Sequence, residues 1–198
     1  MEGVWAHFTD LLRTRLEAAV FTTEDSIRYT FYSAFSAKTG IEPHEIVLEF
    51  PHPQIKRARV DTYLPAFRGA SVAIEFKYDR EIPSGQAIPK PQKAGQLFKD
   101  MDRLARFDLD HPVRRLLVYV ADPLMVVYFR NPANGHARFF LLPQGESLSV
   151  QREYLKGKPG TFVNSLGAEP DFKLTCLWRA SLPRGNELRV HEVTPPQM

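Results

Sequence analysis

The sequence predicts one α/β domain, built on a mixed central β-sheet flanked by helices, with a β-hairpin near its C-terminal end. Residues 45–78 contain runs in which apolar and polar side chains alternate, as in half-buried strands. A helical pattern at 92–107 precedes a continuous apolar run at 116–120, so a strand–helix–strand crossover is expected. Two later apolar runs flank Pro183-Arg184-Gly185-Asn186, a sequence typical of a hairpin turn.

Length and composition favour a single globular domain. The chain has 198 residues, of which 43% are hydrophobic and 25% charged, and these values exclude a disordered or fibrous protein. Its 26 basic and 23 acidic residues give a net charge of +3, which permits nucleic-acid binding without requiring it.

The cellular setting follows from what the sequence lacks. A single cysteine, Cys176, excludes an internal disulfide framework and a multi-thiolate zinc site. No apolar run approaches the roughly 18 residues of a membrane span, and the first residues lack the basic start of a signal peptide. We therefore expect a cytoplasmic protein with no membrane contact.

Two helices are expected before the first strand. Apolar residues recur at three- and four-residue steps from Val4 to Val20, which predicts a helix. Thr22-Thr23-Glu24-Asp25 resembles an N-cap followed by acids, and the apolar stripe after it runs to Gly40, a residue that suits a helix end.

Three neighbouring antiparallel strands are expected next, at 45–50, 57–64 and 71–78, with a short link at 65–70 between the second and third. Residues 79–91 contain several prolines and predict a functional or mobile loop.

Expectations beyond residue 122 are less specific. Residues 124–130 suit either a helix or a strand. A strand is expected at 137–142, a helix at 148–155 and a frayed tail at 194–198.

The third expected strand carries the chemically informative residues. Glu75 and Lys77 are two positions apart, so they project from one face of the strand while Phe76 enters the core. Asp61 lies on the adjacent expected strand, so the three side chains can converge at one end of the sheet. Two carboxylates suit Mg²⁺, and an ammonium beside the metal can position an attacking water and offset charge on a phosphate. The three residues therefore predict metal-assisted phosphodiester hydrolysis.

These residues resemble the PD-(D/E)XK nuclease superfamily, which has the restriction-endonuclease-like fold. The similarity lies in Arg59-Val60-Asp61-Thr62-Tyr63 and Ala73-Ile74-Glu75-Phe76-Lys77, with Val60 where the motif's name has proline. The resemblance covers roughly residues 20–122, the expected core, and leaves 123–198 as a C-terminal extension. It implies that Asp61 and Glu75 bind Mg²⁺, with Mn²⁺ as a substitute, and that Lys77 is the catalytic lysine.

The resemblance also suggests further site residues. Many members add a glutamate from a helix before the first strand, for which Glu24 is the best positional match. Glu45 and Glu49 are alternatives, and a first-turn acid such as Glu24 is also explained by the helix dipole, with Arg28 four residues later to neutralise it. Some members carry a glutamine on the following helix, for which Gln92 and Gln96 are candidates.

Basic residues form two groups that could contact a phosphate backbone. Lys56, Arg57 and Arg59 directly precede Asp61, and Lys90 lies at the end of the proline-rich segment. The second group, Arg103, Arg106, Arg114 and Arg115, is better explained as a solvated helix end.

The sequence therefore predicts a Mg²⁺-dependent DNA endonuclease of the restriction or repair type, acting as a homodimer or as a subunit of a larger complex. The alternatives are a catalytically silent nuclease fold that binds nucleic acid or supports an assembly, and an accidental pattern in which a surface salt bridge joins Lys77 to an acid. There is no glycine-rich phosphate-binding motif, and the histidines lack metal-ligand spacing.

Overall fold

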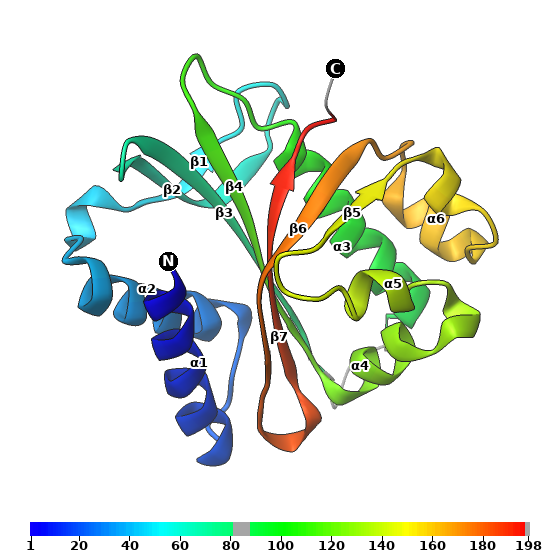
Figure 1. Ribbon diagram of the computed structural model, residues 1–198, viewed down its shortest axis with the longest axis horizontal. Coiled ribbons are helices and arrows are strands. Elements are labelled where there is room, and N and C mark those ends of the chain that lie inside the picture. The colour runs from blue at the N-terminus through cyan, green and yellow to red at the C-terminus, as the bar shows by residue number, and fades with distance from the viewer. Residues whose placement is uncertain (81–87, 197–198) are drawn as a thin grey trace.

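The computed structural model describes residues 1–80 and 88–196, which form a seven-stranded sheet with helices on both faces (Figure 1). The strand order is β1-β2-β3-β4-β7-β6-β5. β3 and β4 are parallel, and every other neighbouring pair is antiparallel. The sheet is therefore mixed, as the sequence predicts.

The elements follow one another along the chain as α1 (Glu2–Glu17), α2 (Glu24–Thr39), β1 (Val47–Pro51), β2 (Arg59–Phe67), β3 (Ala70–Asp79), α3 (Lys90–Ala105), β4 (Val113–Ala121), α4 (Pro123–Arg130), α5 (Ala137–Phe140), β5 (Ser147–Val150), α6 (Gly160–Leu166), β6 (Phe172–Ser181) and β7 (Glu187–Thr194). Short 3₁₀ turns lie at Pro43–Glu45, Pro132–Asn134, Arg152–Leu155 and Pro183–Gly185. None of the helices within the described ranges is both long enough and apolar enough to span a bilayer.

Two hydrophobic cores lie between the sheet and the helices, one on each face of the sheet. α1 and α2 pack on one face of the sheet against Ile74, Phe76 and Val118, and α3 to α6 cover the other face against Ala73, Leu117 and Tyr119 (Figure 1). Alternation along β3 sends successive side chains into opposite cores. The strand is therefore covered on both sides along most of its length, and polar residues on it need local partners.

The N-terminal half matches the expected elements closely. Thr23 caps α2, accepting a hydrogen bond from the Ser26 backbone N–H at 3.2 Å, and Gly40 ends the helix in the left-handed conformation. β2 and β3 extend into the expected link and leave a turn at Arg68 and Gly69, both with positive φ, as a two-residue hairpin requires. Of the expected loop at 79–91, residues 81–87 lie outside the described part of the chain.

The C-terminal half contains two wrong predictions. Residues 137–140 form helix α5, where the adjacent Phe139 and Phe140 are both buried, and a helical turn rather than an alternating strand accommodates such a pair. Residues 147–150 form strand β5, with Leu148 and Val150 buried between exposed serines. Residues 124–130 are helical, α6 was not predicted, and the β6–β7 hairpin is confirmed.

Residues after 122 contribute to the same sheet as those before them. β7 pairs with β4, and β6 and β5 follow outward. Gly95 of α3 lies so close to α6 that an added Cβ would meet the Phe162 carbonyl oxygen at 2.5 Å. The C-terminal segment therefore fixes α3, the helix that faces the polar end of β3.

Candidate active site

The site lies at the end of β3 where its backbone pairing with β2 stops. Their backbone pairing runs from Phe67 and Ala70 to Thr62 and Ile74. Beyond this pair, Oδ2 of Asp61 accepts a hydrogen bond from the Phe76 backbone N–H at 2.7 Å. Oε2 of Glu24, in the first turn of α2, accepts one from the Tyr78 N–H at 3.1 Å. Two carboxylates thus satisfy β3 amide groups at this end of the strand, which positions both acids against it.

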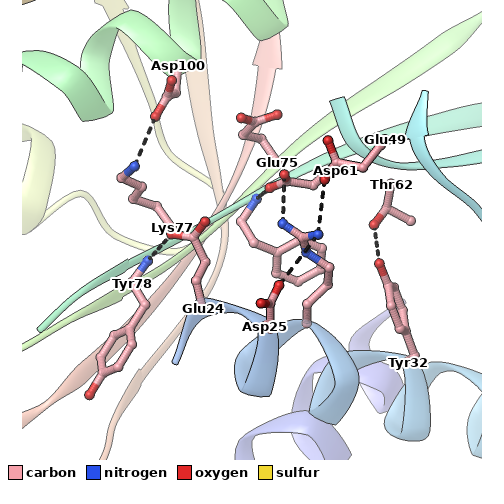
Figure 2. A network of polar contacts seen from close by, with 12 residues as sticks. Glu24, Asp25, Tyr32, Glu49, Asp61, Thr62, Glu75, Lys77, Tyr78 and Asp100 are labelled. Carbon is pink, nitrogen blue, oxygen red and sulfur yellow. Dashed lines mark hydrogen bonds and ion pairs between the residues drawn. The ribbon is translucent and has the colours of Figure 1, made fainter. Parts of the chain in front are cut away.

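Glu75 and Lys77 project toward this end as expected, with Phe76 in the core between them. Figure 2 shows Asp61 beside Glu75, and Lys77 directed away from them toward Asp100 of α3. The Lys77 Nζ lies 3.6 Å from an Asp100 carboxylate oxygen. The predicted convergence is therefore seen for the two acids only, because the Lys77 ammonium lies apart from them and pairs with Asp100, an additional acid.

Two arginines from opposite layers pair with the central carboxylates. Nη2 of Arg28, on α2, lies 2.8 Å from Oδ1 of Asp61, and its Nη1 lies 3.2 Å from Glu49. Arg103, on α3, pairs with Glu75 and lies 3.4 Å from Asp100. We call Glu24, Glu49, Asp61, Glu75 and Asp100 the carboxylate cluster; Arg28, Lys77 and Arg103 are its cations.

Burial disfavours the charged forms of Asp61 and Glu75, the two central carboxylates. Glu75 is 6% exposed, and its burial together with the charge of Asp61 raises its pKa well above the ordinary value, against the effect of Arg103. Burial also raises the pKa of Asp61, although the Phe76 N–H and Arg28 oppose the shift. Two such carboxyl groups side by side favour binding a proton or a cation.

Lys77 remains an ammonium ion. Burial lowers its pKa, but the carboxylates of Asp100, Glu24, Asp79 and Glu75 raise it by more, so the net shift is upward. A protonated lysine donates hydrogen bonds and stabilises negative charge; it does not act as a base.

The donor set is chemically suited to a hard divalent cation but is engaged with arginine. Oε2 of Glu75 is buried with no hydrogen-bond partner in the described structure, and the carboxylate of Asp61 lies beside it. Oxygen ligands of this kind suit Mg²⁺. As they stand, however, the described residues include no group of three histidine, cysteine, aspartate or glutamate side chains that could hold a metal ion. In the described structure, Asp61 and Glu75 are instead paired with Arg28 and Arg103.

A pocket of about 260 Å³ adjoins Lys77. Glu24, Lys77 and Gln96 line it, together with Arg80 and Lys93. Of the two candidate glutamines it is Gln96 that lines this pocket, because Lys93, Gln96, Asp100 and Arg103 recur at helical spacing on the β3-facing side of α3.

The remaining carboxylate candidates have different positions. Glu45 lies outside the cluster, since its Oε2 accepts a hydrogen bond from the Glu42 N–H at 2.8 Å in a 3₁₀ turn. Glu49 reaches the cluster through Arg28. Arg28 was expected to neutralise Glu24, and its charge does lower the pKa of that acid. Its ion pairs within the described residues, however, are with Asp61, Glu49 and Asp25.

The predicted phosphate-contacting residues are all exposed. Lys56, Arg57 and Arg59 lie on the β1–β2 connection and the start of β2, two to five residues before Asp61, and Lys90 begins α3. None of the four forms an ion pair within the described ranges. They are therefore available to an anionic partner.

The second basic group is not a uniform solvated face. Arg103 belongs to the site, and Arg115 is buried, with hydrogen bonds to the Phe107 carbonyl and Asp108. Arg106 and Arg114 pair with Asp102 and Glu192. Sequence reasoning missed Asp100 and Arg103 as site residues, although their spacing from Gln96 on one helix face was a usable signal.

Comparison of the chain with protein-family models, curated proteins and solved structures found no match.

Proposed function

We propose that the chain is a divalent-metal-dependent deoxyribonuclease of the PD-(D/E)XK type, with a restriction-endonuclease-like fold, that hydrolyses internal phosphodiester bonds of DNA. One observation carries the proposal: a buried oxygen of Glu75 that has no hydrogen-bond partner among the described residues lies beside Asp61, with the Lys77 ammonium on the same face of β3. The antiparallel β1–β2–β3 unit and the parallel β3–α3–β4 crossover support the fold.

Asp61 and Glu75 would hold Mg²⁺, or Mn²⁺ in its place. When bound, such an ion polarises a phosphoryl oxygen and lowers the pKa of a coordinated water. Lys77 donates hydrogen bonds to the attacking water and to the phosphate oxygens, which gain negative charge during the reaction. One carboxylate oxygen of Glu24 accepts the hydrogen bond from the Tyr78 N–H, which holds this acid at the end of β3. Gln96 orients polar groups in the adjoining pocket.

The exposed cations provide the DNA-binding surface of this proposal. Lys56, Arg57 and Arg59 precede the metal-binding Asp61, and Lys90 lies at the start of the helix that carries Gln96. Arginine and lysine contacts to phosphates position the duplex without reading its sequence. Cutting both strands would use two copies of the chain in a homodimer, or a partner subunit.

Plasmid nicking tests the proposal. We expect Glu75→Gln and Lys77→Met to lower the Mg²⁺-dependent nicking rate by roughly a hundredfold or more, because each removes charge used in the transition state. Lys99→Met is the matched control, since Lys99 is exposed on α3 next to Asp100 and makes no ion pair in the described structure. Circular dichroism verifies the fold, and undiminished nicking by both site variants would contradict the proposal.

The arginine pairs favour a second candidate, a silent nuclease fold that binds nucleic acid in an assembly. Arg28 and Arg103 already neutralise Asp61 and Glu75, so the fold holds these acids without a metal. DNA binding with no detectable Mg²⁺ or Mn²⁺ binding by calorimetry would favour this candidate over the nuclease.

A further inference from the structure

Arg28 and Arg103 contact the carboxylate oxygens that a metal ion needs. Arg28 pairs with Oδ1 of Asp61, and Arg103 pairs with Oε1 of Glu75. The other oxygen of Asp61, Oδ2, accepts the hydrogen bond from the Phe76 N–H. Of the carboxylate oxygens of Asp61 and Glu75, only Oε2 of Glu75 has no hydrogen-bond partner among the described residues. A cation that binds both acids must therefore displace at least one guanidinium group.

Neither arginine is held only by the acid it would release. Arg28 also lies 3.2 Å from Glu49 and 3.7 Å from Asp25, while its buried Nε has no hydrogen-bond partner in the described residues. Arg103 also lies 3.4 Å from Asp100. Each guanidinium can leave the central pair and keep a carboxylate partner on its own helix or on β1, so a side-chain rotation suffices.

Building on the proposed function, we propose that Arg28 and Arg103 are exchangeable counter-ions that compete with the divalent cation for Asp61 and Glu75. In the metal-free protein they neutralise two buried acids that would otherwise repel each other. A divalent ion replaces them, and the competition sets the metal concentration at which the site fills. The arginines are positioning residues here, acting through the carboxylates.

Calorimetric titration of the full chain with Mn²⁺ tests this competition. We expect Arg103→Met and Arg28→Met each to bind Mn²⁺ about fivefold more tightly than the wild type, because a partly exposed ion pair no longer has to break. The titration is made at pH 8 to limit protonation of Glu75, whose pKa burial raises. Arg106→Met is the matched control, since Arg106 directly follows the last residue of α3 and pairs with Asp102 of that helix at 2.7 Å.

Thermal unfolding provides a second readout that needs no cleavage. In EDTA, Arg103→Met should melt below the wild type because it leaves Glu75 buried and unpaired, and Mn²⁺ should raise its Tm by more than it raises that of the wild type. If this variant does not fold, Arg28→Met serves instead, since Asp61 keeps its hydrogen bond from Phe76.

The outcomes separate the two proposals. Mn²⁺ binding that is equal in the wild type and both variants, or weaker in the variants, overturns the exchange but leaves the nuclease proposal standing. No Mn²⁺ binding by any of the proteins overturns both. Tighter binding in the arginine variants and unchanged binding in Arg106→Met supports the exchange.

Discussion

Two regions of this molecule bury polar side chains, and they treat charge in opposite ways. In the carboxylate cluster, Asp61 and Glu75 are paired with arginine and lie at the point where a strand leaves its neighbour. On the α3 face of the sheet, His136 and His191 are fully buried among aromatic rings, and burial lowers the pKa of each to about 3. The first region pairs its buried acids with arginines, whereas the second holds its histidines neutral.

The comparison shows that burial of a polar group does not by itself indicate a functional site. Both ring nitrogens of His191 lack hydrogen-bond partners in the described structure, as does Oε2 of Glu75. The difference lies in the neighbours: aromatic rings pack against the histidines, whereas Glu75 lies near two other acids, Asp61 and Asp100, and pairs with Arg103. A cluster of opposite charges can exchange partners with a metal or a phosphate, and an aromatic core cannot.

Helix α3 joins the two regions. Phe98 and Met101 on one side of it are fully buried in the aromatic core, while Gln96, Asp100 and Arg103 face the site. Changes to the core should therefore alter stability first, and changes to the carboxylates should alter activity first.

The largest effect is expected from Asp61→Asn. The amide oxygen can still accept the hydrogen bond from Phe76, so the fold should survive, but loss of the charge removes a metal ligand. We expect the Mg²⁺-dependent cleavage rate to fall roughly a hundred- to a thousandfold. Asp108→Asn, which alters only an exposed acid paired with Arg115, is the control. Full activity in Asp61→Asn would assign the cluster a structural role.

Phe98→Ala should produce the largest loss of stability in the aromatic region. The side chain is fully buried and contacts the rings of Phe139, Tyr154 and Phe162. Its truncation should lower the free energy of unfolding by about 3–5 kcal/mol, as measured by urea denaturation. If the folded variant also lost Mn²⁺ affinity to the extent that Asp61→Asn does, the two regions would not be separable.

Acid should affect the two regions in opposite directions. The folded pKa of His191 is about 3 against an ordinary 6.5, so the unfolded chain binds more protons between these values and stability falls as pH falls. The pKa of Glu75 is raised in the folded protein. Its contribution to stability is therefore fully present below pH 4.5, the ordinary pKa of the carboxyl group, and is lost as pH rises through the folded pKa.

His191→Phe checks the histidine contribution. Between pH 6.5 and pH 4, the wild type should lose roughly 2–3 kcal/mol more unfolding free energy than the variant does, as measured by urea denaturation. Equal losses in the two proteins would show that His191 is not held neutral in the fold.

The smallest expected stability effect is that of Gly95→Ala. The added methyl would meet the backbone of Phe162 and the Ser165 side chain, so α3 must move away from α6. We expect a loss of about 1–3 kcal/mol in unfolding free energy. Because α3 carries Gln96, Asp100 and Arg103, the cleavage rate should fall as well. Gly160→Ala is the control, since no atom lies within 4 Å of its added Cβ.

Local patterns in the sequence predicted most of the N-terminal half. Capping by Thr23, the end of α2 at Gly40 and the alternation of β3 each depend on neighbours in sequence, and each is confirmed. α5 and β5 were exchanged because runs of four residues are too short for either periodicity to be distinctive.

The site was predictable to the extent that one strand carries it. Alternation places Glu75 and Lys77 on one face, and the adjacent strand places Asp61 opposite them. The partners of Arg28 and Arg103 could not be predicted, because a long side chain chooses among acids on several elements. Only the packing of α2 and α3 on opposite faces of the sheet decides which acids are within reach.

The most direct measurement is a crystal structure of the wild type soaked with Mn²⁺, with data collected at an energy where manganese scatters anomalously. We predict an anomalous peak within bonding distance of both Asp61 and Glu75, with at least one of Arg28 and Arg103 moved away from them. An undisturbed pair of arginines, with no peak between the two carboxylates at saturating Mn²⁺, would contradict the metal-dependent site.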